Sequence, residues 1–382
     1  PVINYYESLK SPAISANVSF LDTDGVVSNE SIMGGEMLRF TVDFAELGTF
    51  SIDENKHKLM IGGVKNVNTK SSKQTATLDA ISVESFINET ARVAGRYKDT
   101  SIDETVRKLI GEAAGIRAIK TDKSVFAEPT ANKYSFVGNL RRPIDTIQWL
   151  CPKAQASSKN FGFLFFENRD GFHFKSIENL LKQEPEFLYK KPDRPTETDL
   201  RIIENNLNQS NDMGINARMG MYSNRTIYID LENETYEEVD FNISELNPDK
   251  PLKVIETLKE KPTRLMFRIL DQGALQKGSK KEEVEKRNEL AVYQNKSYIR
   301  NNLLFSQSLN MSVPLNPDLR AGQMIEVKMP LRKSEDGKPV DSYGSEKDND
   351  ISGKYMISEL RHLIGGGKAE TQLELVRDAF TA

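Results

Sequence analysis

Three histidines are the only side chains in this sequence whose ordinary pKa suits general acid–base catalysis near neutral pH, and imidazole is also the commonest metal ligand. They are His57, His173 and His362. Each lies in a sequence context typical of a strand, and none has a second ligand at metal-binding spacing. No Gly-x-Ser-x-Gly segment is present to place a serine nucleophile. The sequence therefore predicts that all three histidines are structural.

Two short segments resemble ligand-binding motifs without completing them. Gly365–Lys368 has the glycines of a phosphate-binding loop, but Ala369 stands where that motif needs Ser or Thr, and the segment joins two strand-like runs. Its glycines more simply permit a tight turn with positive φ. Asp22–Gly25 opens like a calcium loop but lacks the further acids and the closing Glu, so a turn is predicted there.

The remaining candidates are acidic side chains and a single thiol. Asp336, Asp341, Asp348 and Asp350 could together hold a cation, although a solvated loop is the simpler interpretation. No pair of carboxylates stands out for glycoside hydrolysis. Cys151 is the only cysteine, which excludes an intrachain disulfide and a cysteine-rich metal site and suits assembly in a reducing cytoplasm. We therefore predict no catalytic, cofactor-binding or metal-binding residue, no cofactor and no enzymatic activity.

Length and composition describe a globular protein of several domains. A chain of 382 residues is long enough for two to four domains of roughly 100–200 residues each. Its formal net charge of -4 gives no general attraction to nucleic acid. The first thirty residues lack a basic region followed by an apolar one, and no apolar run reaches the roughly 20 residues that span a bilayer. Neither a targeting signal nor membrane insertion is predicted.

Residues 1–90 are predicted to form a first β domain. Apolar and polar residues alternate from 37 to 45, with Leu38, Phe40, Val42 and Phe44 on one side, which is typical of a half-buried strand. The same period recurs from 75 to 80, where the apolar positions are Ala76, Leu78 and Ala80, and an apolar run lies between at 59–61.

Residues 91–192 are predicted to form a mixed α/β domain. Ser101 and Glu104 have the spacing of a capping box, and apolar residues follow at helical spacing up to residue 113. Pro143 begins a second short helix that ends at Leu150. Residues 161–174 contain two aromatic runs separated by Asn, Asp and Gly, which indicates a hairpin. A core hairpin covered on both faces is favoured over an exposed partner surface.

The rest of the chain is predicted to form a second β domain, interrupted by an insertion. Strands with period-two alternation are expected within 193–245 and again within 300–382. Residues 246–299 are rich in Lys, Glu and Pro and are interpreted as the insertion, with the run 280–287 as a solvated helix face. Residues 334–350 are polar and are expected to form an exposed loop.

These elements, in this order, resemble the baseplate central hub family of contractile-tailed phages, typified by gene product 27 of the T-even phages. The resemblance covers most of the chain and is clearer after residue 140. It lies in the helix at 143–150 leading to the hairpin at 161–174, and then in the segments Ile177–Leu180, Gln183–Pro185, Leu319–Val327, Gly353–His362 and Thr371–Asp378. The last strand pairs also resemble the late-control and spike-hub proteins of other contractile systems.

The resemblance implies an α+β fold that is mainly β, with two tube-like antiparallel β-barrel domains, the mixed α/β domain and the charged insertion. It also implies a homotrimer, a ring of six β domains that adapts the sixfold tail tube to the threefold central spike. The implied partners are the central spike protein, the tail tube or tube-initiator protein, baseplate wedge proteins and the tape measure protein. DNA would pass through without specific binding. The implied location is the tail baseplate of the virion, after assembly in the host cytoplasm.

Two other functions stay open from the sequence. One is a tail-associated hydrolase of the cell envelope, and the other is the spike hub of a related contractile injection or secretion system. For a hub, the acidic character of the chain suggests a bore lined by negative charge, which would repel phosphate and let DNA slide.

Overall fold

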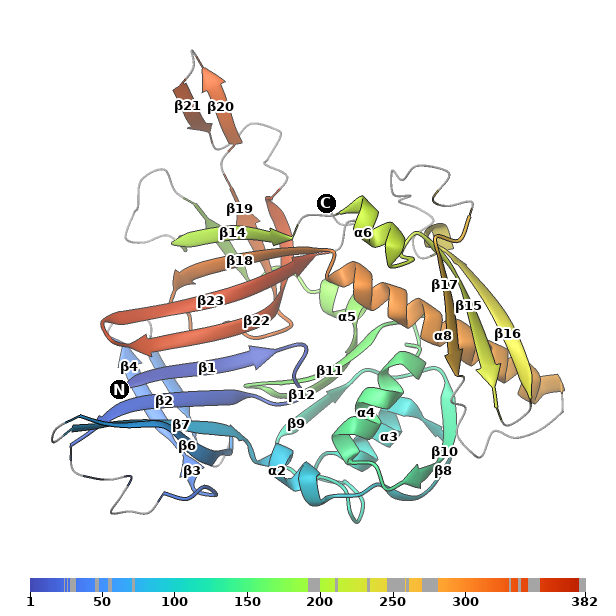
Figure 1. Cartoon of the computed structure of the whole chain (residues 1–382), viewed down its shortest axis with the longest axis horizontal. Helices are drawn as coiled ribbons and strands as arrows, with labels where there is room; N and C mark the ends of the chain where they lie inside the picture. Colours follow the sequence, from blue (N-terminus) through green and yellow to red (C-terminus); the bar gives the residue numbers. More distant parts are fainter. Residues whose placement is uncertain are drawn as a thin grey trace.

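The structure is a computed structural model in which the chain is mainly β. A large antiparallel sheet lies beside a smaller α/β unit, and a third, three-stranded sheet stands at the far end of a long helix (Figure 1). The residues that the structure describes are 1–23, 25, 27, 32–44, 48–53, 57–70, 73–191, 200–209, 212–231, 234–245, 258, 261–269, 281–329, 331–335, 338–342 and 351–377.

The large sheet, here called the central sheet, draws its strands from both ends of the chain. Its order is β14-β18-β23-β22-β1-β2-β7-β6-β3, and β19 and β13 branch from β22. The bounds are β1 Val2–Ser8, β2 Ser15–Asp22, β3 Met37–Leu38, β6 Leu59–Lys70, β7 Lys73–Ser82, β13 Phe187–Lys190, β14 Glu204–Gln209, β18 Gln307–Pro314, β19 Met324–Lys328, β22 Gly353–Gly365 and β23 Lys368–Arg377.

Two halves of the central sheet have the same strand order. The N-terminal half is β1-β2-β7-β6 and the C-terminal half is β14-β18-β23-β22, and in both the strands follow one another in the same chain order. A further strand pairs with the start of the fourth one in each half, β3 with β6 and β19 with β22. The halves join where β1 and β22 pair antiparallel, from Val2 opposite Gly365 to Ser8 opposite Glu359.

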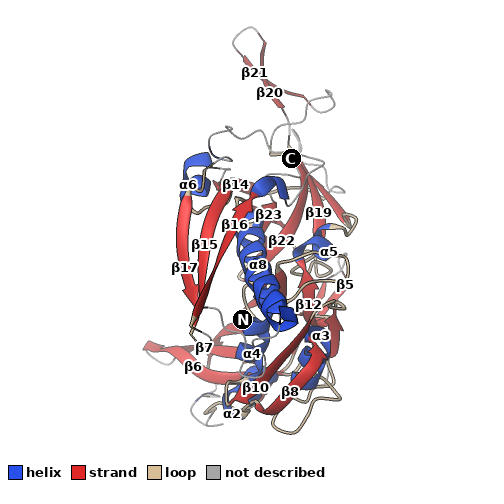
Figure 2. Ribbon diagram, turned by 90° about the vertical axis from the view of Figure 1, so that its right-hand side faces the viewer, coloured by secondary structure: helices blue, strands red, loops and turns tan. Residues whose placement is uncertain are grey.

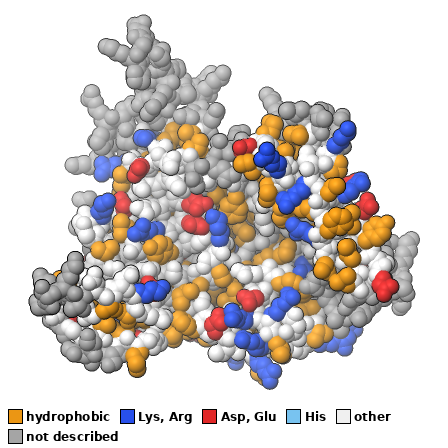
Figure 3. All heavy atoms as spheres, in the orientation of Figure 1, with side chains coloured by type: hydrophobic (Ala, Val, Ile, Leu, Met, Phe, Trp, Pro, Cys, Tyr) orange, Lys and Arg blue, Asp and Glu red, His pale blue; other side chains and the backbone are white. Residues whose placement is uncertain are grey.

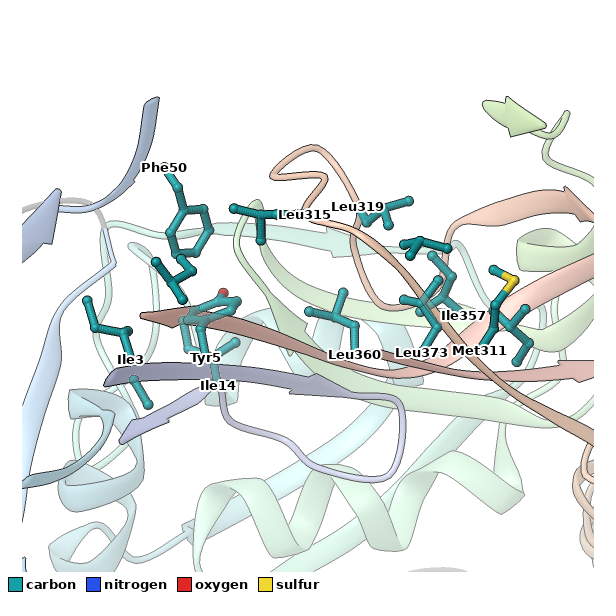
Figure 4. Close-up of a cluster of buried hydrophobic side chains, with 14 of the residues drawn as sticks. Ile3, Tyr5, Ile14, Phe50, Met311, Leu315, Leu319, Ile357, Leu360 and Leu373 are labelled. Carbon is teal, nitrogen blue, oxygen red and sulfur yellow. The ribbon is translucent and has the colours of Figure 1, made fainter. Parts of the chain in front are cut away.

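One face of the central sheet carries a single hydrophobic core that spans both halves. Tyr5, Leu309 and Leu375 are fully buried there, and Phe50 packs edge-on against Tyr5 from the hairpin of β4 (Phe40–Phe44) and β5 (Gly48–Ile52). Figure 4 shows this cluster, in which side chains from β1 lie beside side chains from β18, β22 and β23. Strand alternation places these residues on one side and polar residues on the other.

The alternating run at 37–45 forms two strands instead of the one that its period predicted. Met37 and Leu38 pair with β6, whereas β4 pairs with β5 outside the central sheet. The predicted strand around Ala76, Leu78 and Ala80 is confirmed as β7, and all three of these side chains are buried. Alternation shows which residues share a face, but it does not show where a strand changes its pairing partner.

The α/β unit contains the predicted helix and hairpin. Helix α4 runs over Pro143–Leu150 with the proline in its first turn, and β11 (Phe163–Asn168) and β12 (Gly171–Ser176) form the hairpin. The hairpin is buried on both faces, as predicted for a core element. The other elements are α2 Val83–Thr90, β8 Ala94–Ser101, α3 Ile102–Leu109, β9 Ser124–Ala127, β10 Lys133–Asn139, a 3-10 turn at Cys151–Lys153 and α5 Ile177–Leu181.

The predicted capping box at Ser101 is wrong. Ser101 occupies the N-cap position of α3, but its side chain makes no capping hydrogen bond. The hydroxyl of Thr130 instead accepts hydrogen bonds from the backbone N–H groups of Ile102 and Asp103, at 3.0 and 3.2 Å. A residue distant in sequence therefore satisfies the free donors that every helix start presents.

The segment expected to be an insertion forms part of the interior. Helix α8 (Lys281–Leu304) lies between the α/β unit and a sheet of β15 (Ser223–Asp230), β16 (Thr235–Asn242) and β17 (Arg264–Ile269) (Figure 2). Within the segment 246–299, its buried Leu290 and Ile299 belong to two hydrophobic clusters, and Leu304 at the end of the helix belongs to a third. β15 pairs with β17 in parallel, so the hairpin assigned to 193–245 forms one sheet with a strand of the segment 246–299. A parallel pairing leaves no local sequence signal. Short elements beside it are α6 Met213–Arg218 and a 3-10 turn at Ile243–Glu245.

A buried ionic cluster joins the α/β unit to the central sheet. The Lys123 Nζ lies 2.7 Å from a carboxylate oxygen of Glu84 in α2 and 2.7 Å from one of Glu167 in β11. Glu167 also accepts hydrogen bonds from the Ser82 hydroxyl at the end of β7 and from the Ile14 N–H between β1 and β2. The side chains of Lys123, Glu84 and Glu167 are at most 5% exposed.

Two carboxylates share one ammonium in this cluster, so its charges are incompletely balanced. Burial raises the pKa of Glu167 to about 7, although Lys123 opposes that rise, and the neighbouring charge of Glu84 adds to it. Glu7 in β1 forms a second junction, because it accepts hydrogen bonds from the backbone N–H groups of Arg169 and Ala321, and burial raises its pKa too. Buried carboxylates of this kind are retained only when several donors surround them.

Replacing Lys123 by Met should destabilise the fold by about 3–5 kcal/mol, because two buried carboxylates would lose their common cation. Chemical denaturation measures the change. Lys58→Met is the matched control, since Lys58 pairs with the 82% exposed Asp122 and should cost about 1 kcal/mol or less. Equal losses in the two variants would contradict a special role for the buried cluster.

Glu167 should make stability depend on pH in a defined direction. Its folded-state pKa lies above its ordinary value of 4.5, so the folded state favours the protonated form, and the stability this contributes is lost as pH rises from about 4.5 through about 7. The free energy of unfolding of wild type minus that of Glu167→Gln should therefore fall across this window. A difference that stays flat or rises between pH 4.5 and 7 would show that Glu167 is ionised in the folded protein.

Candidate functional surface

The exposed face of the central sheet, opposite its core, is the most extended polar surface that the sheet offers. We call it the polar face and define it by side chains that alternate with the core residues on eight strands: Glu204, Asn206, Asn310, Ser312, Gln372, Glu374, Glu359, Arg361, Asn4, Tyr6, Ser8, Asn17, Ser19, Thr77, Asp79 and Lys65. In Figure 1 the strands β1, β2, β22 and β23 lie in front of β4, so this face is turned to the viewer.

Cross-strand hydrogen bonds organise the polar face. The Arg361 guanidinium donates from two nitrogens to the Asn4 side-chain oxygen, at 2.9 and 2.7 Å, and so ties β22 to β1 at the junction of the two halves. The Asn17 amide donates to Asp79 at 2.7 Å, and the hydroxyls of Ser19 and Thr77 lie 2.9 Å apart. Direct cross-strand pairs of this kind stabilise a sheet and keep its side chains in order.

An open groove of about 450 Å³ lies on the polar face where the C-terminal half meets β1. Tyr6, Asn310 and Arg361 line it, together with Glu359 and Glu374. Lys10 bridges these two acids, at 3.2 Å from each. The groove lining is thus polar and slightly acidic, and it contains no imidazole or thiol.

The charge of the polar face is mixed, with acids in excess. Among its defining residues, Glu204, Glu359, Glu374 and Asp79 are acidic, whereas Lys65 and Arg361 are basic. Figure 3 shows the same side of the molecule, on which acidic and basic side chains are interspersed with uncharged ones. The face therefore lacks the clustered Lys and Arg that neutralise phosphates in nucleic-acid sites.

A short repeat in the sequence, which hydrophobic periodicity alone does not reveal, marks the polar face. Ser15, Asn17 and Ser19 alternate with apolar residues in β2, and Ser308, Asn310 and Ser312 do the same in β18. The strand registers make these positions equivalent, because β2 pairs with β7 as β18 pairs with β23. Comparing the sequence with itself would have found the repeat.

The three histidines lie apart from one another. His362 is buried in the central core, where it stacks on Tyr5 and its Nδ1 lies 2.9 Å from the Thr371 hydroxyl. Burial lowers the pKa of His362 to about 3 and that of His173 to about 4. His173, in β12, stacks between the rings of Phe126 and Phe166. His57 lies in a turn and not in the expected strand, and its Nδ1 accepts a hydrogen bond from the Asp53 N–H. The lowered pKa values of His173 and His362 and the separation of the three imidazoles fit a structural role.

The other sequence candidates also occupy structural positions. Gly366 and Gly367 form the turn between β22 and β23 with φ of 63° and 81°, which confirms the predicted turn. Asp22 accepts a hydrogen bond from the Val27 N–H. Asp24, Asp336, Asp348 and Asp350 lie outside the described residues, and Asp341 lies in the hairpin of β20 (Leu331–Glu335) and β21 (Lys338–Ser342).

No group of three or more His, Cys, Asp or Glu side chains among the described residues could hold a metal ion. Cys151 is buried, and burial raises the pKa of its thiol to about 12, so it is not a reactive thiolate. No helix in the described part of the chain is long and apolar enough to cross a membrane.

An exposed apolar face, which the sequence did not single out, lies on the sheet of β15, β16 and β17. Leu265, Phe267 and Ile269 of β17 are 63–70% exposed, and Tyr236 is 69% exposed. These residues alternate with inward ones such as Met266, which is 8% exposed. β17 has apolar residues on both of its faces, so its sequence does not show which face is exposed to solvent.

Comparison with known proteins finds likeness in structure but not in sequence. No family model matches the chain, and no curated protein matches it by sequence. A tail protein from Neisseria meningitidis aligns over 100% of this chain and 92% of its own length, with a TM-score of 0.53 and 12% identity. The 43 kDa tail protein of prophage MuSo2 from Shewanella oneidensis aligns over 100% and 94%, with a TM-score of 0.51 and 8% identity.

A component of the type VI secretion system of E. coli, described as similar to the T4 tail proteins gp27 and gp5, aligns over 100% of this chain and 76% of its own, with a TM-score of 0.45 and 10% identity. The first two structural similarities cover nearly the whole length of both aligned proteins. They therefore include the two sheet halves, the α/β unit and the third sheet. The chain therefore has the fold of phage tail proteins.

Proposed function

We propose that this protein is the central hub of a phage tail baseplate, a non-enzymatic ring of three copies that adapts the sixfold tail tube to the threefold spike. The observation that carries the proposal is the repeated strand order of the central sheet. Two like halves in one chain give six like units in a trimer, and six units match a sixfold tube on one side while three chains match a threefold spike on the other.

The architecture of the central sheet supports a tube wall. One face is a continuous apolar core and the other is polar and exposed, so the sheet forms a wall with a solvated side. In the proposed ring the polar face lines the bore. Its small excess of acids, without clustered cations, would repel phosphate weakly and let DNA pass without specific binding.

The partners we propose are the central spike protein, the tail tube or tube-initiator protein, baseplate wedge proteins and the tape measure protein. The similarity in fold to two tail proteins supports partners of this kind. The protein would be located in the tail baseplate of the virion after assembly in the host cytoplasm. The spike hub of a related contractile injection system is the second candidate, because the same ring would serve both.

The purified chain should sediment as a trimer of about 130 kDa, three times its mass of 43.2 kDa. Sedimentation equilibrium over a range of concentrations measures this. The same preparation should leave peptidoglycan uncleared, because the proposed role is structural. A monomer that clears cell wall would favour the hydrolase instead.

Reversing the charge of the groove should create affinity for DNA. Wild type should not retard a DNA duplex in a gel at about 0.15 M salt, whereas Glu359→Lys with Glu374→Lys should, because each change adds a phosphate-binding cation to the proposed bore. The control carries the same charge change on the exposed α/β surface, as Glu104→Lys with Glu112→Lys. Equal retardation by both variants would argue against a bore lined by the polar face.

A further inference from the structure

Two edges of the central sheet have no partner strand among the described residues. β3 covers only Leu59 and Met60 of β6, so the later part of that strand, up to Lys70, presents an open edge. At the other end of the sheet, β14 pairs only with β18. Long open edges invite pairing with another chain unless they are covered.

The hairpin of β6 and β7 is a structural copy of the hairpin of β22 and β23. Lys70 and Lys73 close the first turn as Gly365 and Lys368 close the second. Each first strand has an irregularity at the same place, between Ile61 and Gly63 in β6 and between Ile357 and Glu359 in β22, which makes Gly62 the counterpart of Ser358. β-Bulges fix register and twist. β6 has a second irregularity, between Lys65 and Asn68, that β22 lacks, so the two strands are equivalent from Gly63 to Lys65 and again from Asn68 to Lys70.

Side chains follow this equivalence on the polar face. Lys65 in β6 lies opposite Thr77, and Arg361 in β22 lies opposite Gln372, so a cation occupies the same position in each hairpin. In β22 the cation binds Asn4 of the neighbouring strand β1. In β6 no strand among the described residues occupies the corresponding position.

β14 is the counterpart of β1. Asn4 lies opposite Asn17 in β2, and Asn206 lies opposite Asn310 in β18, so the same residue type occupies equivalent positions in both strand pairs. Asn206 is exposed, whereas Asn4 accepts hydrogen bonds from Arg361. From Glu204 to Leu207, before the irregularity at residue 208, β14 therefore pairs as β1 does and carries the same polar side chain.

We propose that the open part of β6 pairs antiparallel with β14 of a second copy of this chain, in the register that joins β22 to β1. The pairing of Val2 with Gly365 then places Glu204 opposite Lys70, and the pairing of Asn4 with Leu363 places Asn206 opposite Asn68. Lys65 faces Thr77 as Arg361 faces Gln372, but it pairs with Asp79 in its own chain, and the irregularity after it separates it from the stretch Asn68–Lys70 that carries the register. The inference rests on the proposed ring and adds the strands and the register that close it.

The pairing is heterologous, because it joins one edge of each chain to the opposite edge of the next. It can therefore close a ring in which every junction, within a chain or between chains, repeats the β1–β22 pairing. It also places residues of opposite charge, Glu204 and Lys70, across from each other at one end of the interface. Pairing of an exposed edge with a strand from another chain is a common mode of protein association.

Cysteines placed in this register test the interface. Asn68→Cys and Asn206→Cys are combined in one chain and oxidised, and covalent dimers and closed trimers are expected on a non-reducing gel. Within one chain the two positions lie on strands seven spacings apart, roughly 30 Å, so an intrachain disulfide cannot form. The natural Cys151 is buried, and each single variant measures any background it causes.

The register control is Asn68→Cys with Asn205→Cys, which moves one thiol by a single residue to the other side of the strand. The expected cross-linking yield is at least several-fold lower than for Asn206. Equal yields, or trimers in sedimentation with no cross-link in the first variant, would overturn this interface while leaving the proposed hub intact. A chain that stays monomeric at all concentrations would overturn both.

Discussion

The pairing of β1 with β22 is the constraint on which the rest of the molecule depends. It brings the first residues of the chain against the last long hairpin and turns two like strand sets into one sheet. One apolar core can then run through both halves, from Tyr5 to Leu375. Without that pairing the two halves would be separate small sheets, and β1 and β22 would each present an open edge. The polar face would then not be continuous.

The α/β unit is held to this sheet by buried polar contacts as well as by apolar packing. Glu167, at the end of β11, accepts from the sheet and binds Lys123, and Glu7 in β1 accepts from the loops around Arg169 and Ala321. Such contacts have strict geometry, because a buried carboxylate that loses a donor is costly. They therefore specify one orientation of the α/β unit against the central sheet, which the proposed ring would require.

The polar face and the two open edges together suggest how the proposed hub would act. The face carries no clustered cations, and the open edges of β6 and β14 repeat the chemistry of a pairing that the chain already makes internally. Assembly would then extend the fold, since the junction between copies would have the same backbone hydrogen bonds as the junction within a copy. In the proposed hub, function would depend on the shape of the sheet, its open edges and its polar face, and the separate positions of the three histidines agree with that.

Local residue types and periodicity determined the elements that do not depend on distant contacts. These are helix α4, which begins at Pro143, the hairpin of β11 and β12, and the glycine turn before Lys368. The polar face was also present in the sequence, as the repeated Ser and Asn positions of β2 and β18. Only the tertiary structure decided that Thr130 caps α3, that β15 pairs with β17 and that α8 lies inside the molecule. The physical reason is that caps, parallel pairings and burial are contacts between residues distant in sequence, whereas a hydrophobic period reports only which residues share a side.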